Sequence, residues 1–336
     1  MSKSLYLPEG YTPALSLRET QHAIKYIKDV FQQALSIQLM LDRVSAPLIV
    51  KKGSGINDDL NGVERKVDFD IKEIGSEAEV VQSLAKWKRM ALYRYGYKPG
   101  EGIYTDMEAI RRDDDMDNIH SIFVDQWDWE KVIKREQRTE DFLKETVKCV
   151  VKAVVYTKRK VSLRYPQLAG VISDDVFFIT TQELEDMYPD KTSKEREKLI
   201  VKEKKTVFIM QIGGKLKSGK KHDGRAPDYD DWALNGDIFV WNEVLQDAFE
   251  VSSMGIRVDE KSLASQLKEA GAEDRMQYDY HKMIADGTLP LTIGGGIGQS
   301  RLCMLLLEKA HIGEVQSSIW PDDMIEKCTA NGITLL

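Results

Sequence analysis

Residues 294–301 read Gly294-Gly295-Gly296-Ile297-Gly298-Gln299-Ser300-Arg301, and an apolar run at 302–307 follows directly. Four glycines within five positions let a backbone approach a bulky ligand closely. We expect a turn at the glycines and then a helix whose first N–H groups and positive dipole end face an anion. Arg301 would lie on the first turn of that helix, suited to grip a phosphate or to stack on a flat base. Because the standard phosphate-binding glycine patterns are absent, a plain tight turn before a buried helix is the alternative.

The composition is that of an ordinary soluble globular protein. The 336 residues are 42% hydrophobic and 31% charged, with a net charge of −7. This acidic balance disfavours a broad electrostatic grip on nucleic acid. Three widely spaced cysteines, Cys149, Cys303 and Cys328, predict neither a zinc site nor a disulfide framework and favour the reducing cytoplasm. No uncharged apolar stretch reaches the length of a membrane span, so the sequence predicts no membrane partner.

The spacing of apolar residues predicts a mixture of helices and strands. Ser16 and Glu19 have capping-box spacing, and apolar residues then recur at helical intervals. The helices are expected at about residues 17–40, 77–93, 140–162, 259–269 and 273–286. The strands are expected at about residues 67–71, 103–111, 122–130, 176–180, 206–212, 237–241 and 247–253.

The order of these elements predicts the fold class. The strands come largely in adjacent pairs with helices around them, unlike the regular alternation of a doubly wound sheet. We therefore expect an α+β fold in which an antiparallel β-sheet core carries helices on one face. No linker divides the chain, which predicts a single domain over residues 1–336 with an N-terminal extension at 1–15. The charged loop at 215–235 is long enough to be an active-site lid.

One predicted strand carries a row of polar side chains. Alternate residues of a strand share a face, so Gln126, Asp128 and Glu130 would line up on one side. Trp127 and Trp129 would take the other side, together with Asp125. A row of amide and carboxylate groups suits a small ligand with an ammonium group. The alternative is a solvated sheet face above a tryptophan-containing core.

Two acids on neighbouring predicted strands form a candidate metal site. Asp237 opens one strand and Glu250 lies in the next, so the carboxylates would meet if the strands pair. Mg²⁺ commonly binds through one or two carboxylates plus phosphate oxygens. Ser252 would fall on the same strand face as Glu250 and meet the same ligand. The alternative is a pair of acids on an exposed edge.

The remaining candidates are weaker on their own. Lys86 and Lys88 diverge on a helix, whereas Ser83 and Trp87 share a face, and a basic helix face is usually only solvated. Asp58 and Asp230 lie in predicted loops, where acids mostly cap turns. The five histidines show no metal-ligand spacing, and no hydrolase elbow is present. Covalent nucleophilic catalysis therefore has no candidate.

Taken together, these segments resemble a class II aminoacyl-tRNA synthetase catalytic core. The first helix followed by Pro47 resembles the motif that builds that family's dimer interface. Arg111 resembles the arginine of the second motif, which grips the α-phosphate, and residues 294–301 resemble the third motif. A more specific resemblance, over nearly the whole chain, is to the ammonia-dependent (type A) asparagine synthetases. It rests on the blocks at 83–89, 124–130, 225–232, 235–237 and 250–257.

This resemblance implies the reaction of aspartate, ATP and ammonia to asparagine, AMP and pyrophosphate through a β-aspartyl adenylate. A carboxylate is a poor electrophile, and fixed cations at the α-phosphate would lower the barrier to its activation. The resemblance implies a catalytic Arg111 there, with Mg²⁺ held by Asp237 and Glu250. The other ATP contacts would be Ser252, Gly294, Gly295, Gly296 and Arg301. The aspartate contacts would be Ser83, Lys88, Gln126, Asp128, Asp230 and Ser253, of which Lys88 and Gln126 are also catalytic candidates.

The nitrogen donor is expected to be free ammonia, because no N-terminal cysteine nucleophile of a glutaminase is visible. At neutral pH most ammonia is ammonium, which must lose a proton before it attacks. Asp58 is the hypothesised proton acceptor. The resemblance also implies a homodimer.

Two other functions stay open on the sequence. A tRNA synthetase or tRNA-dependent relative would share the adenylation step, but the acidic chain lacks an appended basic or OB-like domain. A catalytically silent amino-acid sensor would be expected to lose the arginines or the metal acids. Arg111, Arg301, Asp237 and Glu250 are all present.

Overall fold

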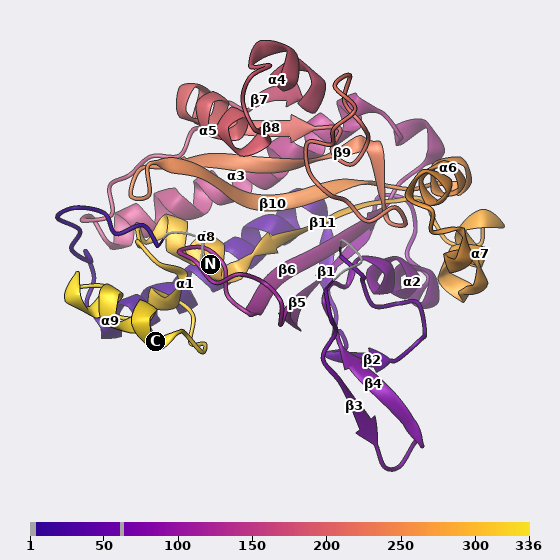
Figure 1. Cartoon of the computed structure of the whole chain (residues 1–336), viewed down its shortest axis with the longest axis horizontal. Coiled ribbons are helices and arrows are strands. Elements are labelled where there is room, and N and C mark those ends of the chain that lie inside the picture. Colours follow the sequence, from indigo (N-terminus) through magenta and orange to yellow (C-terminus); the bar gives the residue numbers. More distant parts are fainter. Residues whose placement is uncertain (1–4, 61–63) are drawn as a thin grey trace.

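A mixed β-sheet runs through the centre of the protein, whose computed structural model describes residues 5–60 and 64–336 (Figure 1). Within these residues the main sheet has eight strands in the order β1-β5-β6-β11-β10-β9-β8-β7. The strands are β1 (Leu41–Arg43), β5 (Gly102–Ile110), β6 (Phe123–Val132), β11 (Thr292–Gly298), β10 (Asp247–Arg257), β9 (Asp230–Asn242), β8 (Thr206–Met210) and β7 (Phe177–Thr180). The α+β class is confirmed. Neighbouring strands are antiparallel except at the two edges, where β1–β5 and β7–β8 are parallel, so the expectation of a purely antiparallel sheet is wrong there.

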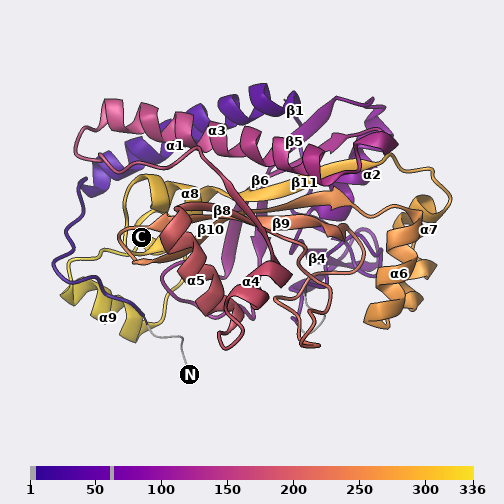
Figure 2. The ribbon, with the colours of Figure 1, turned by 90° about the horizontal axis from the view of Figure 1, so that it is seen from above.

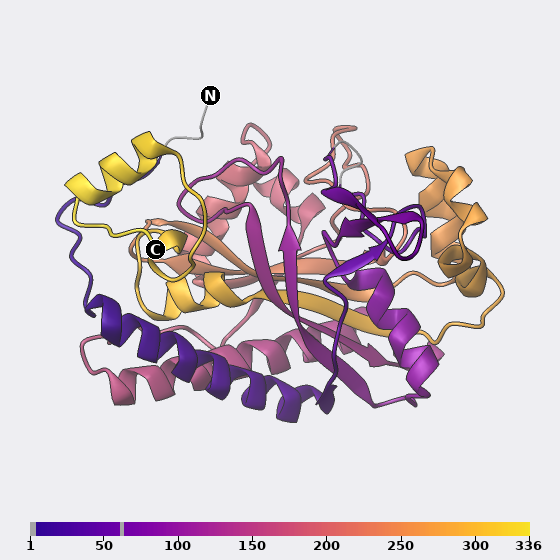
Figure 3. The ribbon, with the colours of Figure 1, turned by 90° about the horizontal axis from the view of Figure 1, so that it is seen from below.

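One face of the sheet is covered by α1 (Leu17–Leu39), α3 (Glu140–Arg164) and α8 (Gln299–Leu306). Figures 2 and 3 show α1 and α3 running side by side along this face. The predicted capping box starts α1: the Ser16 hydroxyl accepts from the Glu19 N–H at 3.3 Å, and the Glu19 carboxylate accepts from the Ser16 N–H at 2.9 Å. The buried stripe of α1 then packs on the tryptophans of β6. This interface is the largest part of the hydrophobic core.

The opposite face is also covered, which corrects the expectation of helices on one face only. α4 (Thr181–Met187) and α5 (Ser193–Lys204) pack on Val207, Ile209 and Phe239. The intervening residues Phe208 and Ile238 join the core under α1 and α3. Strands whose side chains are apolar on both sides need cover on both sides. α2 (Ala85–Tyr95) covers β5 and β6 on this second face.

A small sheet projects from the body beside α2 (Figure 1). It consists of β2 (Ile49–Lys51), β4 (Ser76–Val80) and β3 (Asp68–Ile71) in antiparallel order. The predicted helix at 77–93 is therefore wrong over residues 77–84, because Ala78 and Val80 alternate with charged residues and pair across this sheet, and α2 begins only at Ala85. The remaining helical elements are α6 (Glu260–Ala270), α7 (Asp279–Ala285), α9 (Asp322–Ala330) and the 3₁₀ turns η1 (Arg135–Gln137), η2 (Glu273–Gln277) and η3 (Ile312–Glu314). The predicted helix at 273–286 is thus split into η2 and α7.

The part of the N-terminal extension that is described lies against the body. The Tyr6 N–H donates to the Asn118 side chain at 2.8 Å, and the Tyr11 hydroxyl donates to Glu314 at 2.9 Å. Among the described residues, no helix is long and apolar enough to cross a bilayer. The assignment of the chain to one domain stays a prediction.

Candidate active site

The glycine segment lies at the centre of the sheet, as strand β11 between β6 and β10. The expected turn is wrong, since residues 294–298 are paired strand without left-handed φ angles. Glycine is required for a different reason. A Cβ on Gly294 would lie 1.9 Å from the Glu130 Oε2, and one on Gly296 would lie 2.2 Å from the Gln126 Oε1. The side chains of β6 therefore occupy the space above β11.

Helix α8 begins directly after this strand, and Arg301 lies on its first turn as predicted. The first N–H groups of this helix were expected to face an anion, and one of them faces a carboxylate of the protein itself. The Ser300 N–H donates to Asp125 Oδ1 at 3.0 Å, and the Ser300 hydroxyl donates to Asp125 Oδ2 at 2.8 Å. A carboxylate of the protein itself thus caps this helix on the side away from the candidate site.

The strand register builds a row of functional positions across the second face. Asp128 of β6 lies opposite Gly296 of β11, which lies opposite Ser253 of β10, which lies opposite Asp237 of β9. Directly opposed residues of antiparallel strands share a face. The hairpin β9–β10 and the two more distant strands β6 and β11 therefore place their predicted site residues on one line.

The alternation predicted for β6 is confirmed. Trp127 and Trp129 are fully buried in the main core, while Asp128 faces α2 on the other side. There the Lys88 ammonium forms a buried ion pair with Asp128 and also donates to the Gly295 carbonyl at 3.1 Å. Gln126 lies over Gly296, next to Asp128. Ser83 precedes α2, and its hydroxyl accepts from the Ala85 N–H at 3.1 Å.

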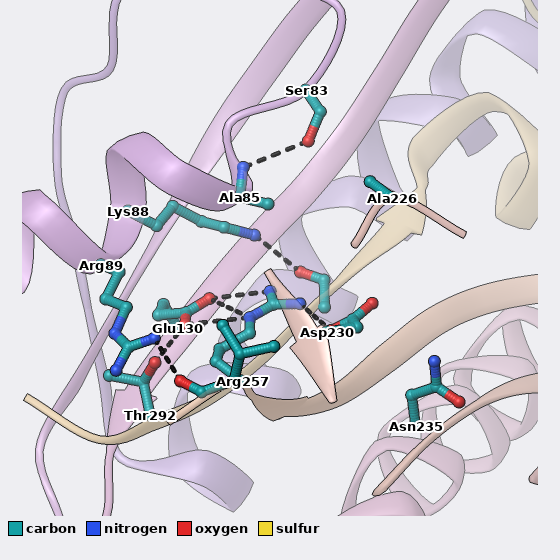
Figure 4. Close-up of polar contacts among 12 residues, drawn as sticks. Ser83, Ala85, Lys88, Arg89, Glu130, Ala226, Asp230, Asn235, Arg257 and Thr292 are labelled. Atoms are coloured by element: carbon teal, nitrogen blue, oxygen red, sulfur yellow. Dashed lines mark hydrogen bonds and ion pairs between the residues drawn. The ribbon is translucent and has the colours of Figure 1, made fainter. Parts of the chain in front are cut away.

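A second charged cluster adjoins this one (Figure 4). Arg257 donates to both oxygens of Glu130, at 3.0 and 2.8 Å, and pairs with Asp230. Thr292 donates to Glu130 at 2.6 Å. Burial raises the pKa of Glu130, but Arg257 outweighs burial and holds that pKa below its usual value. Asp230 begins strand β9, so the prediction of a loop position for Asp230 is wrong.

The two candidate metal acids share the same face. Glu250 lies opposite Phe239, two residues along β9 from Asp237. Arg225 forms an ion pair with Asp237, and Arg301 lies 3.5 Å from Glu250. Burial raises the pKa of Asp237, Arg225 opposes that rise, and the nearby Glu250 adds to it. The buried Oδ1 of Asp237 has no hydrogen-bond partner among the described residues.

These acids fit a magnesium ion that is completed by a nucleotide. Among residues 5–60 and 64–336, no cluster of three or more His, Cys, Asp or Glu could hold a metal alone. Mg²⁺ needs only one or two carboxylates when phosphates supply further oxygens. The orphaned oxygen of Asp237 and the carboxylate of Glu250 are suitable donors.

The predicted face of Ser252 is wrong. A β-bulge between Glu250 and Ser252 shifts the alternation by one residue. Ser252 therefore lies opposite Ile238 and Ile297, both of which belong to the main core, and its buried hydroxyl points to that side of the sheet. Ser253 takes the place on the site face that was expected for Ser252.

Arg111 and Asp58 lie outside this row and are linked to each other through Gln82 and Asn57. Arg111 follows β5, and its guanidinium donates to the Gln82 carbonyl at 3.2 and 3.3 Å. Burial raises the pKa of Asp114, whereas Arg111 and Arg301 both lower it, which places the two arginines around one acid. Asp58 is 1% exposed, and burial raises its pKa while Lys86 opposes the rise.

The loop expected as a lid ends earlier than predicted. Residues 230–235 belong to β9, so the irregular segment stops at residue 229. It is fastened to the site by Arg225, and His222 contacts Glu197 of α5 at 3.0 Å. A lid motion stays a prediction.

The sequence alone led to no functional role for four charged residues of this region, although Lys86 was weighed beside Lys88. They are Lys86, Arg225, Asp228 and Arg257. Arg225, Asp228 and Arg257 lie inside the sequence blocks at 225–232 and 250–257. A charged residue that lies between apolar neighbours in a strand, as Arg257 does beside Ile256 and Val258, was the available signal for a buried ion pair.

The fold defines the class of protein. Asparaginyl-tRNA synthetase from Entamoeba histolytica, in complex with asparaginyl-adenylate, superposes with a TM-score of 0.63 at 13% identity, over 89% of this chain and 66% of that chain. The Pyrococcus horikoshii asparaginyl-tRNA synthetase complex gives 0.62 at 15% identity, over 90% of this chain and 70% of that one. The chain thus has the catalytic-domain fold of class II aminoacyl-tRNA synthetases and spans about two thirds of the length of these enzymes.

The family follows from sequence. The aspartate–ammonia ligase family matches residues 18–332. The aspartate–ammonia ligase of Clostridium tetani is 60% identical over 336 residues, which cover 100% of this chain and 98% of that protein. The Lactobacillus acidophilus enzyme is 61% identical over 334 residues, covering 99% of each. The chain belongs to the aspartate–ammonia ligase family.

Proposed function

We propose that this protein joins ammonia to the side-chain carboxylate of aspartate, using ATP and forming a β-aspartyl adenylate on the way. The observation that carries the proposal is the row Asp128, Gly296, Ser253 and Asp237 across four strands. One end of this row is rich in ion-paired acids and bases, and the other holds the candidate metal acids.

In the first step the aspartate side-chain oxygen attacks the α-phosphorus of ATP, and pyrophosphate leaves. Negative charge builds on the α-phosphate, so a fixed cation there lowers the barrier. Arg111 takes that role, and Arg301 with Gly294, Gly295 and Gly296 seats the rest of the nucleotide. Asp237 and Glu250 would hold Mg²⁺, which supplies positive charge at the phosphates when bound.

The aspartate would lie over β6 and β11. Lys88 is the donor suited to a carboxylate, and Asp128 and Asp230 are the acids suited to the α-ammonium. Ser83, Gln126 and Ser253 supply uncharged hydrogen-bonding groups around it. Because Lys88 and Asp128 are already paired, the aspartate would exchange partners with them rather than bring new charge into a dry pocket.

Ammonia would then attack the acyl carbon and AMP would leave. We assign Asp58 as the group that collects ammonium and takes its proton. The variant Asp58→Asn is expected to keep aspartate-dependent pyrophosphate exchange within about threefold and to lower asparagine synthesis at limiting ammonium by about 100-fold, since one acid–base group contributes roughly 10²–10⁴. Full synthesis by this variant at low ammonium would contradict the assignment.

The function is tested by mass spectrometry of the products from ATP, Mg²⁺, aspartate and ammonium chloride. Asparagine, AMP and pyrophosphate are expected in equal amounts. Without ammonium, only aspartate-dependent exchange of pyrophosphate into ATP should remain. Transfer of the aspartyl group to tRNA instead of ammonia would favour the tRNA-dependent alternative. Absence of pyrophosphate exchange with any amino acid would favour a sensor.

The unpaired state of Cys149, Cys303 and Cys328 supports our proposal of a cytoplasmic location.

A further inference from the structure

Lys86 and Asp228 form a buried ion pair beside Asp58. The Lys86 Nζ lies 2.8 Å from the Asp228 Oδ2, and the two side chains are 2% and 0% exposed. Lys86 lies on α2, whereas Asp228 lies in the loop before β9. A buried ion pair pays a large desolvation cost and often adds no net stability, so it invites a functional explanation.

Lys86 is tied to the backbone next to Asp58. Its ammonium also donates to the Asn57 carbonyl at 3.4 Å. The Asn57 side-chain oxygen in turn accepts from the Asp58 N–H at 3.0 Å and from the Gln82 N–H at 2.9 Å. The position of the Lys86 charge is thus fixed relative to the Asp58 backbone.

Asp228 has two further partners besides Lys86. Its Oδ2 lies 2.9 Å from Arg275 and 2.9 Å from the Nε2 of His281, in addition to Lys86. Asp228 would therefore remain paired if the charge of Lys86 were removed. The three contacts converge on one oxygen and hold the Lys86 ammonium in place.

Asp58 itself has one free oxygen. Its Oδ1 accepts from the Leu60 N–H at 3.0 Å, while its buried Oδ2 has no hydrogen-bond partner among the described residues. A buried carboxyl favours the neutral acid, which cannot accept a proton. Lys86 is the largest influence in the opposite direction on the pKa of Asp58. The other ionisable groups around Asp58 are Arg111 after β5, Asp228 and Tyr229 before β9, Arg275 in η2, Lys66 before β3 and Asp59 on its own loop.

We propose that Lys86 is a positioning residue for the ammonia step. Its ammonium, fixed by the Asn57 carbonyl and by Asp228, favours the carboxylate form of Asp58 against the effect of burial, and Asp228 keeps that ammonium turned away from Oδ2, so that this oxygen stays free for the ammonium ion. Ammonium gives one proton to Oδ2 and becomes ammonia, whose lone pair forms the bond to the acyl carbon. The bond from that carbon to the AMP oxygen breaks and its electron pair leaves with AMP, while a second proton passes from nitrogen to solvent. This inference rests on the role proposed above for Asp58.

The test compares Lys86→Met with Lys158→Met. Lys158 is a matched control, because it too is buried, pairs with a carboxylate (Glu308, 2.8 Å) and donates to a carbonyl (Leu306, 3.1 Å). Both variants are measured by aspartate-dependent pyrophosphate exchange and by kcat/KM for ammonium across pH. Ammonium's own titration is common to all variants and cancels in the comparison.

For Lys86→Met we expect exchange to stay within about threefold of wild type. Loss of the positive charge raises the pKa of Asp58, so the acid limb of kcat/KM for ammonium moves to higher pH by about one unit or more. At a pH on that limb kcat/KM falls by about tenfold or more. Lys86→Arg keeps the positive charge, so the acid limb should stay at its wild-type pH. Lys158→Met should change neither the pyrophosphate exchange rate nor the pH of the acid limb.

Asp228→Asn gives the opposite shift. Removal of this anion lowers the pKa of Asp58 and frees Lys86 to pair with Oδ2, so the acid limb moves to lower pH while KM for ammonium rises. An unchanged limb in Lys86→Met, or equal loss of exchange and synthesis, overturns the proposal. Failure of the premise looks different: wild type would then make no asparagine from ammonium, or Asp58→Asn would retain full synthesis.

Discussion

Gly294 and Gly296, which are separated by one residue, have different roles. A Cβ on Gly294 would meet Glu130, which Arg257 and Thr292 hold from two sides and which cannot move aside. A Cβ on Gly296 would meet the end of the Gln126 side chain, which has rotatable bonds to yield. Gly294 is required because Glu130 fills the space above it. Gly296 is required because the end of the Gln126 side chain lies over it and would have to move.

We therefore expect Gly294→Ala and Gly296→Ala to separate stability from activity. Gly294→Ala should lower the free energy of unfolding by about 1–3 kcal/mol through overpacking. Gly296→Ala should cost less than about 1 kcal/mol, yet lower kcat/KM for aspartate by about tenfold or more, because Gln126 must leave its place. Urea unfolding and initial rates measure the two effects. The same loss of stability in both variants would contradict this division.

At the scale of elements, the starts of α1 and α3 show how local sequence features stabilise a helix end. α1 begins with a reciprocal capping box, in which both Ser16 and Glu19 satisfy backbone N–H groups. α3 begins with the Thr139 hydroxyl alone, which accepts from the Phe142 N–H at 3.2 Å. Both helices cover the same face of the sheet. The start of α1 is therefore stabilised by local groups as well as by packing.

Ser16→Ala should lower the free energy of unfolding by about 1 kcal/mol, because it leaves the Glu19 N–H without its cap. Ser16→Asp is the control, since aspartate is an equally good capping residue. It should restore stability to within about 0.5 kcal/mol. Urea unfolding at one fixed protein concentration measures both, and equal destabilisation by the two variants would argue against a capping effect.

The predictable parts of the fold and site are those that depend on near neighbours in sequence. The period of two in β6 placed Asp128 and Gln126 correctly, and the spacing of Ser16 and Glu19 placed the start of α1. Ser252 was misplaced because a bulge arises from how two strands pair, which one strand's sequence does not record. The glycines of β11 were expected to turn, since nothing in their own sequence indicates the side chains of β6 above them. The ion pair between Lys86 and Asp228 could not be predicted either, because the two residues are 142 positions apart and neither local sequence indicates the other.

At the scale of the whole molecule, apolar side chains are exposed where α1 passes into β1 and β2. Ile37 is 76% exposed, Met40 is 68% exposed and Leu48 is 51% exposed. Clustered exposed apolar residues commonly mark a protein–protein contact. Ile37 lies in the last turns of α1, Met40 caps that helix and Leu48 follows Pro47, so these positions support our proposal of a homodimer through this surface.

Ile37→Glu should convert the proposed dimer to monomer at micromolar concentration, because a charge would be buried in an apolar contact. Val171→Glu is the control, as Val171 is 93% exposed on a loop. Sedimentation velocity over a range of concentrations measures the mass of each. A monomeric wild type, or an unchanged Ile37→Glu dimer, would falsify the assignment of this surface.

The ionic pairs Lys88–Asp128 and Arg257–Asp230 have a consequence for selectivity. A zwitterionic ligand can replace these ion pairs with ion pairs of its own. The electrostatic free energy lost on binding is therefore small for a molecule that carries both signs of charge. A ligand that carries charge of only one sign would leave one residue of each ion pair charged and unpaired in a low-dielectric environment. If aspartate binds at these pairs as proposed above, we expect analogues that lack the α-amino group to be excluded at the binding step, before any chemistry begins.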